Sequence, residues 1–142
     1  MMEEKILATF LGEELRAYFE VEALEEKEKE WWLIVKERKT NYPAALKEGG
    51  GEIVLDGYCK ELEMIDFPFR GKPMYWKIYR RRWKRAGEDK HYHNNYELHP
   101  RGCKCTKEFG DFLKSLTREE QNEFFTSFPS IRTECEKAVS VV

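Results

Sequence analysis

Residues 66–85 read DFPFRGKPMYWKIYRRRWKR, and this stretch sets the architecture expected for the chain. Arg70 and Gly71 lie between two prolines, where we expect a tight turn because glycine supplies the backbone freedom that such turns require. The strand expected after the turn, over residues 74–83, is rich in aromatic side chains, which favour strands. The stretch therefore predicts a β-hairpin whose returning strand ends in concentrated positive charge.

Successive side chains of a strand point to opposite faces, which divides this strand into two sets. One set begins apolar and ends basic, and consists of Met74, Trp76, Ile78, Arg80 and Arg82. The other set consists of Tyr75, Lys77, Tyr79, Arg81 and Trp83. We expect Trp76 in the core, whereas core packing and base stacking are comparable alternatives for Trp83.

Charge is distributed unevenly along the chain. Lys and Arg against Asp and Glu number 9 against 17 in residues 1–69, 10 against 3 in residues 70–101 and 6 against 7 in residues 102–142. A basic segment in an acidic chain creates a local positive potential that the formal net charge of −2 conceals. Two interpretations follow: a charged strand edge that prevents sheet aggregation, or a surface for a polyanion. Like charge clustered at one end favours the polyanion.

Composition sets the class of protein. The 142 residues are enough for one domain with its own core, and 41% apolar residues argue against disorder. We expect a cytoplasmic protein with no membrane contact, because no leader and no long apolar run are present. The four cysteines, Cys59, Cys103, Cys105 and Cys135, are unevenly spaced, which predicts thiols rather than disulfides.

Periodicity predicts the remaining elements of the N-terminal part. Apolar residues at helical spacing predict an amphipathic helix over residues 3–19, interrupted near Gly12. The Glu-rich run of residues 20–30 is expected to be a solvated helix end or loop. Strands are expected at residues 31–39 and 52–67, the second bent at Asp56-Gly57. Residues 91–99 are expected to pair with the basic strand as a second hairpin.

The C-terminal part is expected to be helical. Thr106 can cap one helix, and Thr117 with Glu120 forms the pattern of a capping box that opens the next. Pro129 is expected to begin a third. The prediction is an α+β fold with a small antiparallel sheet of four or five strands, in a domain over residues 1–116 that includes the basic hairpin region 53–101. Residues 117–142 are expected to form a helical tail, resembling an incomplete helix-turn-helix.

The middle of the chain resembles a known protein family. The segments GYCKELEMIDFPFRGKPMYWKIYRRRWK and NNYELHPRGCKCTKEFGDFLKSL resemble the N-terminal region, or first-frame product, of Aon-type insertion-sequence transposases, in particular the order of Asp-Phe-Pro, Arg-Gly-Lys and Arg-Arg-Arg-Trp. A more distant resemblance is to the zinc-ribbon region of ISL-type transposases. This chain lacks the cysteine knuckles of that region, so the ribbon is expected without zinc.

The resemblance implies a non-catalytic role in binding the terminal repeats of a mobile element. It implies duplex DNA and the separate catalytic part of the transposase as partners, and a nucleoid-associated location in the cytoplasm; a homo-oligomer is left open. No cofactor is expected, and no phosphate cradle or catalytic constellation is evident in the sequence. Asp56 and Asp66 lie beside turns, where Asp forms local hydrogen bonds.

Arginine and lysine neutralise phosphates, and arginine can also bond to guanine edges in the major groove. The residues expected to contact DNA are Arg70, Lys72, Lys77, Arg80, Arg81, Arg82, Trp83, Lys84 and Arg85.

Two other interpretations compete with DNA binding. His91, His93, His99, Cys103 and Cys105 could supply ligands for zinc, although Cys-x-Cys is tighter than the usual knuckle. Alternatively, phenylalanines 109, 112, 124, 125 and 128 could dock a protein partner, but such a cluster is more often the interior of a helical pair.

Overall fold

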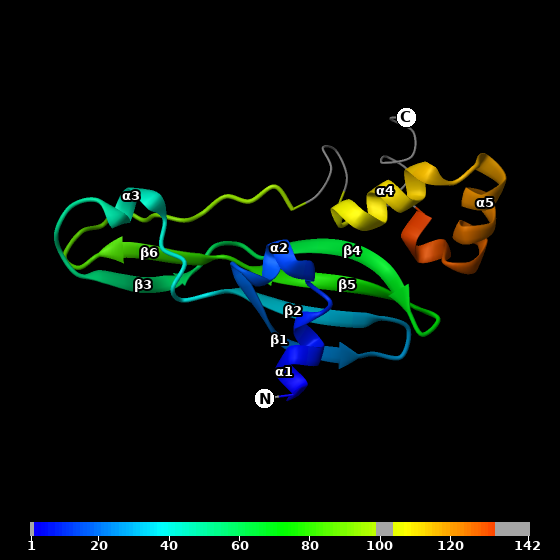
Figure 1. Cartoon of the computed structure of the whole chain (residues 1–142), viewed down its shortest axis with the longest axis horizontal. Helices are drawn as coiled ribbons and strands as arrows, with labels where there is room; N and C mark the ends of the chain where they lie inside the picture. Colours follow the sequence, from blue (N-terminus) through cyan, green and yellow to red (C-terminus); the bar gives the residue numbers. More distant parts are fainter. Residues whose placement is uncertain (1, 99–103, 133–142) are drawn as a thin grey trace. The chain divides into compact units, whose positions relative to one another are not determined.

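A computed structural model of the chain describes residues 2–98 and 104–132. The elements, in chain order, are α1 (Met2–Ala8), α2 (Gly12–Arg16), β1 (Phe19–Glu26), β2 (Trp31–Glu37), α3 (Ala44–Lys47), β3 (Ile53–Tyr58), β4 (Leu62–Phe69), β5 (Lys72–Tyr79), β6 (Arg81–Arg85), α4 (Lys107–Ser115) and α5 (Arg118–Ser127) (Figure 1). The fold is α+β, as the sequence predicts.

The strands form two sheets. A four-stranded mixed sheet has the order β1-β2-β5-β4, and β3 pairs with β6 in a two-stranded antiparallel ribbon. The expected single antiparallel sheet is therefore replaced by a mixed sheet and a separate ribbon. The turn between β4 and β5 lies where it was predicted, with positive φ at Arg70 (51°) and Gly71 (80°), as two-residue hairpin turns require.

The chain divides into two compact units. Unit 1 comprises residues 1–24, 34–62 and 77–96, and unit 2 comprises residues 25–33, 63–76 and 97–142. Strands of the four-stranded sheet contribute residues to both units, and the boundary expected after residue 116 stays a prediction. Each unit is described separately below.

The N-terminal region differs from the single helix expected over residues 3–19. Two short helices, α1 and α2, are separated before Gly12, whose φ of 75° is unfavourable for other residues. The Glu-rich run after them was wrongly expected to be a helix end or loop, since most of it forms strand β1. Ion pairs with Lys36 of β2 and with Arg38, which follows β2, explain how strand structure tolerates this acidity: Lys36 Nζ lies 2.8 Å from Glu22, and Arg38 Nη1 lies 3.5 Å from Glu20.

The strand expected over residues 74–83 is broken at Arg80, so that β5 and β6 belong to different sheets. Before the break, Met74, Trp76 and Ile78 are buried, which confirms the predicted apolar face. After the break, alternation restarts on the pairing with β3, and Arg81 and Trp83 become the buried residues. In the part of the chain that the structure describes, the second hairpin consists of one bridge between Trp83 and Tyr92.

Unit 1 contains a buried polar network centred on Glu37, whose exposed fraction is 0%. One carboxylate oxygen accepts from the backbone N–H of Arg81 (2.8 Å), and the other accepts from Asn94 Nδ2 (2.9 Å) and from the Tyr96 hydroxyl. Burial, followed by the hydrogen bond to Glu37, raises the pKa of Tyr96, so this hydroxyl remains a donor. The network joins the end of β2 to β6 and to the segment at residues 94–96.

Unit 2 has an apolar core beneath helices α4 and α5. Its buried members are Ile65, Cys105, Phe109, Leu113, Phe125 and Ile131. Both predicted caps are present: the Thr106 side chain accepts from the Phe109 N–H, and Thr117 and Glu120 form a reciprocal capping box. A helical turn also begins at Pro129, as predicted, and continues to the end of the described residues at Arg132.

The Glu37 network predicts a large cost for a conservative substitution. Glu37→Gln should lower the free energy of unfolding by about 2 kcal/mol, because the amide NH2 group would face buried donors that then lack an acceptor. Urea denaturation measures this change. Glu22→Gln, which removes only an exposed ion pair, is the matched control and should cost well under that amount; equal losses in the two variants would contradict the central role of Glu37.

The buried Asp66 in unit 2 predicts that an asparagine substitution gains stability in a pH-dependent way. Burial raises the pKa of the Asp66 carboxyl, which accepts a hydrogen bond from Thr106 Oγ1 (2.9 Å). A raised folded-state pKa stabilises the protein at low pH, and this stabilisation is lost as pH rises through that pKa. Asp66→Asn should therefore be more stable than the parent at pH 7, with the difference closing toward acid pH in parallel urea titrations.

The exposed Asp111 provides the control for this measurement. Asp111→Asn should leave the stability difference small throughout the titration. A loss of stability in Asp66→Asn at pH 7 would show that the ionised carboxylate stabilises unit 2.

Candidate nucleic-acid interface

The residues expected to contact DNA fall into the two compact units. Arg70 and Lys72 belong to unit 2, and residues 77–85 belong to unit 1. In unit 2, Arg70 is exposed at the turn, whereas Lys72 Nζ is bound by Glu26 (2.9 Å) and by the Lys27 carbonyl (2.9 Å). Of these two flanking residues, Arg70 is the more exposed to a ligand.

Arg81 and Trp83 are inside unit 1. Arg81 is 7% exposed; its Nε donates to the Glu37 carbonyl (2.6 Å) and its Nη1 to the Tyr58 hydroxyl (3.2 Å). Trp83 is 0% exposed and contacts the Tyr42 ring edge-on, with 6.3 Å between ring centroids. Their side chains are therefore parts of the core rather than surface contacts. Of the two alternatives for Trp83, core packing and base stacking, the structure shows core packing.

Arg80 and Arg85 hold irregular segments of unit 1 in place. Arg80 Nη1 donates to the Asn94 carbonyl (3.4 Å) and to Asn95 Oδ1 (3.2 Å). Arg85 Nη2 donates to the carbonyls of Ala45 (3.3 Å) and Glu48 (2.6 Å), the second of which follows the last turn of α3. Each guanidinium has five N–H donors, so both residues combine a structural role with remaining donor capacity.

The side of the β3–β6 ribbon opposite Trp83 presents the basic side chains. Leu55 pairs with Trp83 and Val54 with Lys84, so Lys84 and Arg82 point away from the Trp83 side. Arg82 Nε donates to the Asp56 carbonyl (2.8 Å), and its side chain remains 41% exposed. We name the surface made by Val54, Asp56, Arg82, Lys84 and His91 the ribbon face.

One carboxylate lies in the middle of the ribbon face. Asp56 Oδ2 contacts His91 Nε2 and lies 3.7 Å from Arg82 Nη2. The hydrogen bond with His91, supported by the charges of His91, Lys84 and Arg82, lowers the pKa of the Asp56 carboxyl although desolvation opposes this shift. The sequence analysis placed Asp56 beside a turn. The signal that Asp56 belongs to the site was its position inside an expected strand, and this strand pairs with the arginine-rich strand β6.

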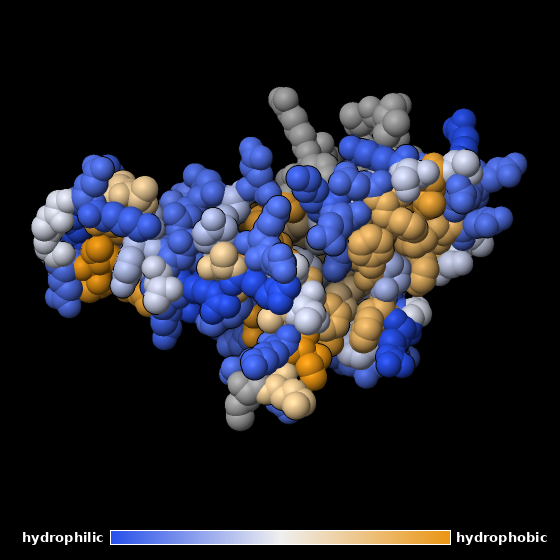
Figure 2. Space-filling view, viewed as in Figure 1, coloured by the Kyte–Doolittle hydropathy of each residue, from blue (hydrophilic) through white to orange (hydrophobic). Residues whose placement is uncertain are grey.

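The phenylalanines of unit 2 are largely interior, as expected for a helical pair. Phe109 is 0% and Phe125 is 4% exposed, whereas Phe112 is 36% exposed and packs on Phe67, which is 37% exposed, with 5.3 Å between ring centroids. Figure 2 shows apolar surface over the region of α4 and α5, in contrast to the mostly hydrophilic surface of the ribbon. Phe112 is therefore the exposed member of the five phenylalanines considered for docking, and it packs on the exposed Phe67.

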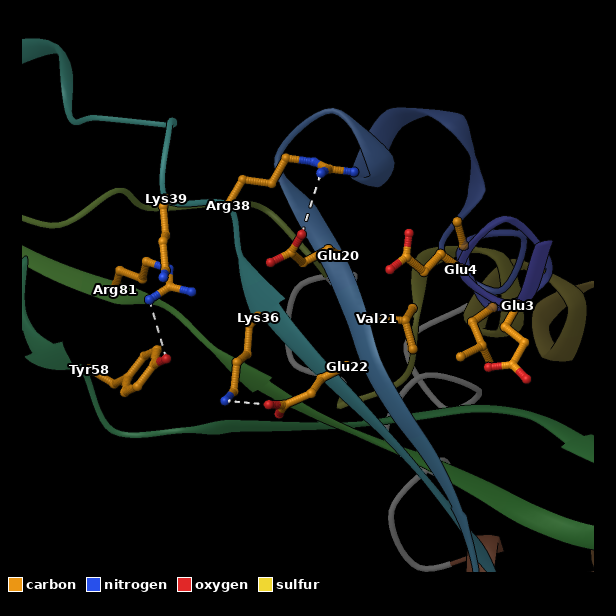
Figure 3. Close-up of a pocket in the computed structure, with 12 residues that line it drawn as sticks. Glu3, Glu4, Glu20, Val21, Glu22, Lys36, Arg38, Lys39, Tyr58 and Arg81 are labelled. Atoms are coloured by element: carbon orange, nitrogen blue, oxygen red, sulfur yellow. Dashed lines mark hydrogen bonds and ion pairs between the residues drawn. The ribbon is translucent and has the colours of Figure 1, made fainter. Parts of the chain in front are cut away.

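Unit 1 also contains an open cleft of about 670 Å³ (Figure 3). Glu20 and Glu22 of β1 line it opposite Lys36, Arg38 and Lys39, and α1 contributes further glutamates. Lys36 and Arg38 are already paired with these strand carboxylates. The balanced charge makes the cleft a poor site for phosphate, and we do not place nucleic acid there.

The zinc alternative is not assembled among residues 2–98 and 104–132, where no group of three His, Cys, Asp or Glu side chains is placed to hold a metal. Cys59 and Cys105 carry thiols, as predicted, and Cys105 is buried in the core of unit 2. The candidate ligands His99 and Cys103 and the thiol of Cys135 lie outside the described residues.

The different environments of two neighbouring cations predict different effects on stability. Arg81→Ala should lower the free energy of unfolding by roughly 2 kcal/mol, because it removes buried hydrogen bonds to Glu37 and Tyr58. Lys84→Ala, on the ribbon face, should change it by about 0.5 kcal/mol or less. Urea denaturation of the two variants tests this assignment, and similar losses would place both side chains in the core.

Comparisons with known proteins found no matching family model, no matching curated protein and no matching solved structure. None of the helices in the described part of the chain is long and apolar enough to span a membrane.

Proposed function

We propose that this chain is a non-catalytic DNA-binding protein that contacts duplex DNA through the ribbon face. The observation that carries the proposal is the division of β6 into two sides. Its Trp83 side is buried in unit 1, while Arg82 and Lys84 lie on the other side, within the only segment of the sequence with a large excess of basic residues.

The shape of the ribbon suits this role. A two-stranded antiparallel ribbon fits the major groove of B-form DNA, where its outward side chains reach phosphates and base edges. Arg80, before β6, and Arg85, its last residue, add charge at the two ends of that strand while holding the neighbouring segments. Lysine and arginine contacts of this kind supply affinity for any duplex, and base-edge contacts supply preference.

The resemblance to first-frame transposase regions provides the finer form of the proposal. In this form, the bound DNA is the terminal repeats of an insertion sequence. The protein partner is the separate catalytic part of the transposase. A nucleoid-associated location would follow from DNA binding. These assignments remain predictions, since the comparisons provide no relative from which to transfer them.

A protein-interaction module is the second candidate. The Phe67–Phe112 pair favours it, since two adjacent half-exposed aromatic rings supply a small apolar surface for a partner. This pair belongs to unit 2, whereas the ribbon face belongs to unit 1, so substitutions can test the two functions separately.

The ribbon face predicts a specific salt dependence of binding. Replacing Arg82 and Lys84 together by glutamine should weaken binding to a short mixed-sequence duplex by roughly tenfold at about 0.1 M salt. It should also reduce the slope of log K against log salt by about 2, because each phosphate contact contributes about 0.9. Fluorescence anisotropy over a salt series measures both quantities.

The matched control removes the same charge elsewhere in unit 1. Lys5 and Lys60 are exposed and lie outside the ribbon, so their joint replacement by glutamine should leave the slope nearly unchanged. Equal weakening in both double variants would indicate general electrostatic attraction. The interaction module would be favoured by two results together. The parent would fail to bind duplex at low salt, and it would bind a protein partner in a way that Phe112→Ser abolishes.

A further inference from the structure

The central carboxylate of the ribbon face conflicts with a surface built only for phosphate. Phosphate binding gains from every uncompensated cation, and a carboxylate among the cations reduces that gain. Asp56 is nevertheless placed within reach of Arg82 and His91, and its contact with His91 ties the segment after β6 to β3. The carboxylate therefore requires an explanation beyond the turn role that sequence reasoning gave it.

We propose that Arg82, Lys84 and His91 form an anion site that Asp56 occupies in the free protein, so that a DNA phosphate competes with Asp56 for these side chains. This inference rests on the proposed function and names the side chains that bind the phosphate. The chemical class of the ligand is a phosphodiester.

Competition follows from the geometry of the site. Arg82 uses Nε on the Asp56 carbonyl, and its Nη2 lies 3.7 Å from the Asp56 carboxylate, longer than a hydrogen bond. The guanidinium is thus positioned by the backbone and only loosely held by the carboxylate. Arginine in such a position can turn its terminal N–H groups to a phosphate without losing the bond that anchors it.

The electrostatics of the site agree with competition. The hydrogen bond with His91, together with the charges of Lys84 and Arg82, lowers the pKa of the Asp56 carboxyl. Asp56 is therefore held in its charged form by the same side chains that a phosphate would use, so removal of its charge should raise DNA affinity.

The experiment measures duplex binding by anisotropy at constant salt and pH, for the parent and variants of the full chain. Asp56→Asn should tighten binding about fivefold, because the competing charge is removed while the amide oxygen still accepts from His91. His91→Gln should weaken binding, because it removes one side chain of the anion site. His93→Gln, two residues away on the same segment, is the matched control and should leave affinity nearly unchanged.

A second control separates competition from overall charge. Glu61→Gln removes one exposed negative charge from unit 1 outside the ribbon, and should change affinity less than twofold. Binding by the parent that Asp56→Asn leaves equal or weaker would overturn this inference and leave the proposed function standing. Failure of both the parent and Asp56→Asn to bind any duplex at low salt would refute the proposed function itself. Inorganic phosphate added at the phosphate concentration of the DNA should compete poorly; equal competition would assign the site to free phosphate instead.

Discussion

The carboxylate of Glu37 is the contact on which unit 1 depends. It lies at the end of β2, and its three hydrogen bonds reach the backbone of β6 and the side chains of Asn94 and Tyr96. Neither the ribbon strand β6 nor the extended segment at residues 94–96 belongs to the four-stranded sheet. A buried acceptor that satisfies donors from both therefore replaces the ladder of backbone bonds that a regular sheet would provide.

This arrangement decides which arginines remain available to a ligand. Arg81 follows the break in the strand, and its backbone N–H and its side chain both bind Glu37, so the residues after it alternate from a fixed starting point. Trp83 is then directed inward, and Arg82 and Lys84 outward. Three consecutive arginines thus have three different roles: Arg80 holds the segment at Asn94, Arg81 completes the core, and Arg82 lies on the ribbon face.

Local signals in the sequence predicted much of the fold. The caps at Thr106 and Thr117 and the turn at Arg70-Gly71 depend on residues close in the chain, so their physics is visible without the tertiary structure. Strand β1 and the break at Arg80 depend on partners far away in the sequence. The run of glutamates forms a strand because Lys36 of β2 and Arg38, which follows β2, pair with it. The expected strand divides into β5 and β6 where the backbone N–H of Arg81 binds the buried carboxylate of Glu37.

The candidate site was predictable in its charge but not in its composition. Counting charges locates the basic segment, yet it treats all cations as equivalent and cannot distinguish a guanidinium bound to buried carbonyls from one on the surface. The same count places Asp56 among the acidic residues of the N-terminal half, whereas pairing of β3 with β6 brings it into the basic surface. Arginines alone would hold DNA tightly and without discrimination, because phosphate contacts are independent of sequence. In the proposed function, an internal carboxylate would lower that general affinity, so base-edge contacts would account for a larger share of the binding that remains.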